Sequence, residues 1–279
     1  MFDFEQMAQW KIFKRPTVEA ALAKAGLVQM LHWKLLRGSH EFPGPDGGTC
    51  INEAAIIAAG YAYRAVKSAN DCPPCFSRPC SAYALALNDY IDDDRHRRRL
   101  LMPFVARLAG SADTLAVERQ RAGMILLRSV TDLLLPRFAG YRRHPITRAL
   151  SRVKTPFDAM MAAASLGGVI QAPKCDSLSM LMVDACEALS AAATAYALDD
   201  AQDTAMQAAR FADRLAREMA RIDPQNPTRA VTRVYARAAA ILDAALKLGK
   251  QPDSIPAESV FGRLQEARAE AHEQNRVAA

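Results

Sequence analysis

The sequence predicts an all-α protein, built as an antiparallel helical bundle or as stacked helical hairpins. Apolar residues recur at intervals of three and four along most of the 279-residue chain, which is the spacing of one helix face. The chain contains no run of alternating β-branched residues flanked by hairpin turns, which would indicate a sheet. Small alanines on facing stripes in its C-terminal part would let neighbouring helices approach closely.

The N-terminal half contains several segments with helical periodicity and recognisable caps or stops. These segments cover residues 17–37, 49–67, 80–90, 93–110 and 113–138. Thr17 can cap the first segment, and Gly38 lies just beyond its end. Pro103 is expected to kink the fourth segment or to mark its true start.

The segment 141–156 mixes prolines with cations and is the candidate boundary between two helical halves. It would separate an N-terminal module, residues 1–140, from an Ala-rich C-terminal module, residues 157–279. In the second module we expect a helix that ends at Asp223, a helix from about Val231 to Gly249, and a last helix from about Pro256.

Composition points to a cytoplasmic protein. The net charge of +6 is small for this length, so charge alone is weak support for an anionic partner. The N-terminus lacks the pattern of a signal peptide, and the longest uncharged run, 159–173, is too short to span a bilayer. We therefore expect no membrane association, and reduced thiols rather than disulfides from the six cysteines.

The stretch HEFPGPDGGTCINEA, residues 40–54, is a candidate anion or ligand site. Thr49 can cap the following helix and place Cys50 in its first turn, where the helix dipole would favour an anion and lower the pKa of the thiol. The candidate residues are His40, Asp46, Gly47, Gly48, Thr49 and Cys50. The alternative is that Asp46 and Thr49 only cap the helix and Cys50 packs as a small apolar side chain.

This stretch also carries a resemblance. WKLLRGSHEFPGPDGGTCINEA, followed by DCPPCFSRP and LNDYIDDDRHRRRLLMPFVARLAG, resembles a group of bacterial and phage-type helical proteins without an assigned activity. The resemblance covers about the first half of the chain. It implies a bacterial or phage origin and a compact helical N-terminal module, and it supplies no catalytic residue.

Cys72, Cys75 and Cys80 form a second candidate site for zinc or for thiol chemistry. Two sulfurs three residues apart can face one ion, and Cys50 or His40 could supply a fourth ligand. A redox role would need a thioredoxin-like βαβ context, which the sequence lacks. The alternative is a proline-stiffened connector whose cysteines have no chemical role.

Two acidic motifs, NDYID and DDAQD, form a third candidate site. They resemble the paired DDxxD motifs of class I isoprenoid synthases, and the resemblance implies magnesium ions that hold a diphosphate. The candidate ligands are Asp89, Asp92, Asp199, Asp200 and Asp203. Such an enzyme needs both motifs at one cavity, whereas helix capping would explain nearly the same residues.

The densest cations are Arg95, Arg98, Arg99, Arg142 and Arg143. The first three share a helix face and could meet phosphates, but no recognisable nucleic-acid module accompanies them, so pairing with neighbouring aspartates is the default. The sequence as a whole favours a binding or regulatory module with a protein partner or self-association and without a cofactor. A zinc or magnesium site is the alternative.

Overall fold

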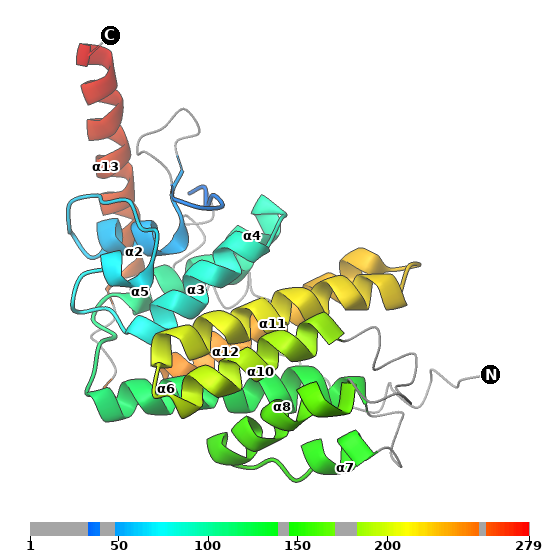
Figure 1. Cartoon of the computed structure of the whole chain (residues 1–279). Coiled ribbons are helices and arrows are strands. Elements are labelled where there is room, and N and C mark those ends of the chain that lie inside the picture. Colours follow the sequence, from blue (N-terminus) through cyan, green and yellow to red (C-terminus); the bar gives the residue numbers. More distant parts are fainter. Residues whose placement is uncertain (1–32, 40–47, 139–144, 171–182, 251–254, 279) are drawn as a thin grey trace.

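The computed structural model has the all-α fold that the sequence predicts (Figure 1). It describes residues 33–39, 48–138, 145–170, 183–250 and 255–278. Within these ranges, the only pairing of extended segments is an isolated parallel bridge between Leu35 and Thr49. The expected helix 17–37 lies mostly outside the described residues, and its expected end is wrong because residues 33–39 are not helical.

The N-terminal half consists of short helices and one long one. These are α2 (Ile51–Ala58), η3 (Ala69–Asp71), α3 (Arg78–Tyr90), α4 (Asp94–Leu101), η4 (Met102–Phe104), α5 (Val105–Leu108) and α6 (Leu115–Arg128). The axis of α6 continues through a π-helix, η5 (Ser129–Leu134), and a 3-10 turn, η6 (Leu135–Arg137). The expected helix 93–110 is divided at Pro103, which lies in η4.

The C-terminal half contains the longer helices. These are α7 (Pro145–Leu150), α8 (Pro156–Ile170), α10 (Val183–Ala197), α11 (Ala201–Ile222), α12 (Pro227–Leu246) and α13 (Ala257–Ala278). The predicted turn at Asp223 and the predicted end near Gly249 are both confirmed. None of the described helices is both long and apolar enough to cross a lipid bilayer.

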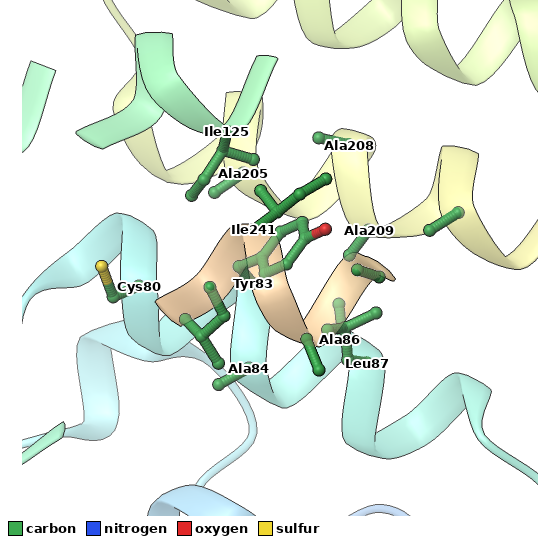
Figure 2. Packing of buried hydrophobic residues seen from close by; sticks show 14 of the residues in the cluster. Cys80, Tyr83, Ala84, Ala86, Leu87, Ile125, Ala205, Ala208, Ala209 and Ile241 are labelled. Carbon is green, nitrogen blue, oxygen red and sulfur yellow. The ribbon is translucent and has the colours of Figure 1, made fainter. Parts of the chain in front are cut away.

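Helix α11 lies at the centre of the molecule and packs along α10, α3, α12 and α6. Figure 2 shows why this is possible: Ala205, Ala208 and Ala209 of α11 present only methyl groups to Tyr83 of α3 and Ile241 of α12. All five side chains are buried. Small residues on the central helix therefore let its neighbours approach while their larger side chains fill the space between the axes.

The hydrophobic core runs through both expected modules. Helix α3, from the N-terminal half, packs directly against α11 and α12 from the C-terminal half. Core residues of both halves, such as Leu87 and Phe211, belong to one continuous buried cluster. The segment 141–156 therefore does not divide the core into two.

Candidate functional site

The entry into α2 is built differently from the predicted cap. The Thr49 hydroxyl accepts a hydrogen bond from the indole N–H of Trp33, at 2.9 Å between Nε1 and Oγ1. Because that oxygen is engaged, the cap moves on by one residue: Cys50 is the N-cap, and its sulfur accepts a bond from the Glu53 amide at 3.4 Å. Thr49 thus joins two chain segments, while Cys50 and Glu53 form a reciprocal capping box.

Glu53 is the chemically decisive residue of this loop, and the sequence reasoning missed it. Its fully buried carboxylate accepts from the Cys50 amide at 2.8 Å, from the Ser39 hydroxyl at 2.9 Å and from the Val66 amide at 3.0 Å. The signal that could have found it is its position three residues after the cap. A buried carboxylate that already occupies the helix N-terminus leaves this end poorly suited to an anionic ligand.

The surroundings of Cys50 disfavour the reactive thiolate that a free helix N-terminus would promote. Burial raises the pKa of Cys50 well above its ordinary value, and the nearby Glu53 carboxylate raises it further. Gly48 approaches the neighbouring segment so closely that a Cβ atom there would lie 2.9 Å from the Lys34 carbonyl oxygen. Of the other candidates, His40, Asp46 and Gly47 lie outside the described residues.

Within the described residues, the three cysteines of the connector do not converge on a common point. Cys72 and Cys80 are buried, and burial raises the pKa of each thiol to about 11. Cys75 is half-buried, with its sulfur 3.4 Å from the Tyr61 hydroxyl. In the part of the chain that the structure describes, no group of three or more potential metal ligands converges. The guanidinium of Arg78 holds the connector by donating to the Cys72 carbonyl at 2.8 Å.

The aspartates of the two acidic motifs have structural partners. Asp89 accepts from the Gly38 amide at 2.8 Å, and Asp92 pairs with Arg37 at 3.1 Å. The second motif behaves similarly, since its residues bond to nearby groups. Asp199 pairs with Arg119 at 3.1 Å, Asp200 caps α11 through the Asp203 amide at 2.9 Å, and Asp203 accepts from Gln207 at 3.2 Å.

The two motifs also lie at different places along α11. The C-terminal end of α3 meets α11 at Asp213, because the Tyr235 hydroxyl donates to Asp213 at 2.9 Å and also lies 2.9 Å from the Tyr90 carbonyl oxygen. Asp200 is at the beginning of α11, roughly 20 Å away along the axis at about 1.5 Å per residue. The motifs therefore do not share a cavity, and the diphosphate-binding arrangement is not formed.

The point where α3 meets α11 carries a buried ionic contact that the sequence reasoning did not single out. Asp213 is 4% exposed, and the Arg217 Nε lies 3.1 Å from both of its carboxylate oxygens. Burial raises the pKa of Tyr235 above its usual range, and the Asp213 charge adds to this. The spacing of Asp213 and Arg217, one helical turn apart, is the signal that sequence alone offers.

The basic run of α4 is divided between surface and interior. Arg95 and Arg99 are exposed and Arg98 is half-buried, while Arg142 and Arg143 lie outside the described residues. Arg97, between them, is 1% exposed and donates to the backbone carbonyls of Leu35 and Asn88. This run therefore serves partly to fix the 33–39 segment against the bundle.

A groove of about 440 Å³ opens beside α6. Its walls come from α6, α8, α10 and the turn that follows α12, through Ala116, Arg119, Gln120, Met124, Leu127, Pro156, Tyr196 and Leu248. The guanidinium of Arg119 lies 5.9 Å from the centroid of the Tyr196 ring, and its charge is paired with Asp199.

Exposed apolar side chains lie next to this groove in sequence. Leu115 and Phe157 adjoin groove residues of α6 and α8, and they are 90% and 63% exposed. Leu198 comes shortly after the groove residue Tyr196 and is 77% exposed, and Met161 lies one helical turn beyond Phe157. The groove and these four residues, its neighbours in sequence, are referred to together as the apolar face.

No protein-family model matches this chain, and neither a curated protein nor a solved structure shows significant similarity to it.

Proposed function

We propose that this chain is a helical binding or regulatory module that acts through protein contacts. The observation that carries the proposal is the apolar face defined by the groove beside α6 together with Leu115, Phe157, Met161 and Leu198. Large exposed apolar side chains that adjoin the residues of a groove are typical of interaction sites, because exposing them to water is unfavourable.

The chemistry of the face favours an amphipathic helix of another protein as the partner. Most of the groove wall is apolar, and the charge of Arg119 is already balanced by Asp199. A helix could insert a row of apolar side chains here and keep its polar face in water. The alternative partner at this apolar face is a second copy of this chain, bound through its own apolar face. The proposal also includes a bacterial or phage origin, which rests on the resemblance of the N-terminal half, and a cytoplasmic location.

Site-specific photo-crosslinking tests the proposal in cells that express the protein. A photoreactive residue at position 157, on the apolar face, is compared with one at Ile222, which is 39% exposed at the end of α11. We expect position 157 to capture one defined protein, identified by mass spectrometry, and Ile222 to give no such adduct. The substitutions Leu115→Ser and Leu198→Ser should abolish the capture.

Sedimentation of the purified protein distinguishes the two occupants. A concentration-dependent dimer that Leu115→Ser and Leu198→Ser dissociate would identify a second copy of this chain. A monomer at all concentrations, with a specific heterologous crosslink, would identify another protein. Equal crosslinking from positions 157 and 222, or no crosslink and no dimer, would contradict the proposal.

A further inference from the structure

Buried arginines in this protein have well-matched partners. Arg97 donates to three backbone carbonyls and to the carboxylate of Asp94. Arg121, which is fully buried, donates to the carbonyls of Ser111 and Leu248 and pairs with Glu118 at 2.8 Å. This is the expected arrangement, because a guanidinium removed from water needs both hydrogen bonds and a counter-charge.

Arg137 is an exception to this arrangement, and the exposed Arg233 and Arg237 act on it electrostatically. Arg137 ends the 3-10 turn η6 and is half-buried, with its Nε 3.4 Å from the Leu133 carbonyl and its Nη1 3.7 Å from the Met219 sulfur. These contacts are long and involve no charged atom. Within the described ranges, no carboxylate lies within ion-pair distance of Arg137.

The other two arginines belong to α12 and share one face, since they are four residues apart. Arg237 reaches toward η5, where its Nη1 is 3.4 Å from the Asp132 carbonyl oxygen. The Asp132 carboxylate is directed elsewhere, to the Thr131 hydroxyl at 2.8 Å and to Arg128 at 3.7 Å. Arg233 and Arg237 are exposed, so their guanidinium groups are available to a ligand.

The positive charges of Arg237 and Arg233 act electrostatically on Arg137. Burial, together with the positive charges of Arg237 and Arg233, lowers the pKa of Arg137 to about 10. Like charges brought together without a counter-ion oppose folding, so an anion bound among them would relieve the repulsion.

We propose that Arg137, Arg233 and Arg237 form a binding site for a phosphate-type oxyanion at the junction of η6 and α12. The planar fork of a guanidinium matches two oxygens of a phosphate, and half-burial of Arg137 strengthens its interaction relative to one in open water. Three neighbouring positive charges favour a polyvalent anion such as pyrophosphate over a singly charged one. This site is separate from the apolar face and does not rest on the proposed protein contacts.

Isothermal titration calorimetry of the full chain at constant ionic strength tests the site, with inorganic phosphate, pyrophosphate and a nucleoside monophosphate as probes. We expect pyrophosphate to bind, and Arg137→Gln to weaken binding roughly tenfold or more, as expected for the loss of charge-assisted hydrogen bonds. The double variant R233Q/R237Q should weaken it similarly, and because both residues are exposed it should fold normally. Tighter binding of the nucleoside monophosphate than of phosphate would identify an organic phosphate as the source.

The matched control removes two charges elsewhere. The double variant R268Q/R276Q, on α13, has the same net charge as R233Q/R237Q and should bind pyrophosphate like the wild type. Thermal unfolding adds a second readout: pyrophosphate should raise the Tm of the wild type but not of R137Q. No binding at millimolar pyrophosphate, binding to duplex DNA alone, or equal loss in the control would overturn the proposal.

Discussion

Arg97 shows how much of this fold depends on a single polar side chain. Its guanidinium joins the carbonyl of Leu35, in the 33–39 segment, to the carbonyls of Asn88 and Ile91 at the C-terminal end of α3. Replacing it by methionine keeps most of the side-chain volume but leaves these buried acceptors without donors, which we expect to cost about 3–5 kcal/mol of unfolding free energy.

Urea denaturation of Arg97→Met measures this effect, with Arg95→Met as the matched control. Arg95 is exposed on the same helix, so its replacement should change stability by less than about 0.5 kcal/mol. Arg97→Lys is informative as well, because it keeps the charge but loses the planar fork and should recover only part of the stability. Equal stability of the methionine variants would refute the role assigned to Arg97.

Sequence reasoning at this scale finds residue types but not their partners. Helical spacing indicates that Arg95, Arg98 and Arg99 share a face, yet the run alone does not show that Arg97 is buried. Its carbonyl partners include Leu35, which is distant in sequence, so no local pattern contains the information. The role of Glu53 is closer to what a local pattern can predict, because its spacing from Cys50 fits a capping box. Cysteine, however, is not among the usual capping residues.

At the scale of elements, helices were predicted better than the segments between them. The segments for α3, α11 and α12 are predicted by their apolar stripes, and Pro103 divides its helix as expected. The predicted helix 49–67 is too long because α2 ends at Ala58 and Gly60 adopts φ +85°. The chain beyond Gly60 leaves the helix, and the Val66 amide bonds to Glu53 rather than to a helical carbonyl.

Gly48, shortly before α2, lies so close to Lys34 and Leu36 that a side chain has little room there, and Gly48→Ala tests this. The added methyl group would lie 2.7 Å from the Leu36 side chain and 2.9 Å from the Lys34 carbonyl oxygen, so the bridge between Leu35 and Thr49 must shift. We expect a loss of about 1–3 kcal/mol, typical of overpacking. Thermal or urea unfolding of the purified variant measures it.

Gly262→Ala is the control for this substitution. Gly262 lies within α13 with no atom near its hypothetical Cβ, so alanine there should stabilise the protein by about 0.5–1 kcal/mol. Opposite signs for the two glycine variants would support the description of the loop. A neutral Gly48→Ala would show that the segment at 34–36 yields easily.

For the whole molecule, composition suggested two modules where the structure has one core. The rise in alanine content after residue 157 accompanies the close packing of α11 against its neighbours. Which helix lies against which is decided by contacts between distant segments, such as Tyr83 and Ile241 with α11 (Figure 2). Periodicity within one segment carries no such information.

Two buried thiols, Cys72 and Cys80, lead to a prediction about the stability of the protein at alkaline pH. Burial raises the pKa of Cys72 and of Cys80 from 9.0 to about 11, so both thiols stay protonated in the folded state after they would ionise in the unfolded chain. Their contribution to stability is complete below pH 9 and is lost as the pH rises through about 11. At about 1.4 kcal/mol per pKa unit, each thiol contributes on the order of 2–3 kcal/mol to this loss.

Urea denaturation under reducing conditions between pH 8 and pH 11 measures the loss, with the thiols compared one at a time. In Cys80→Ala the unfolding free energy starts lower, because a buried side chain is truncated, but it should fall less steeply with pH than in the wild type. Parallel pH profiles for Cys80→Ala and the wild type would mean that the Cys80 thiol ionises as readily in the folded protein as in the unfolded chain, and therefore that water reaches the base of α3.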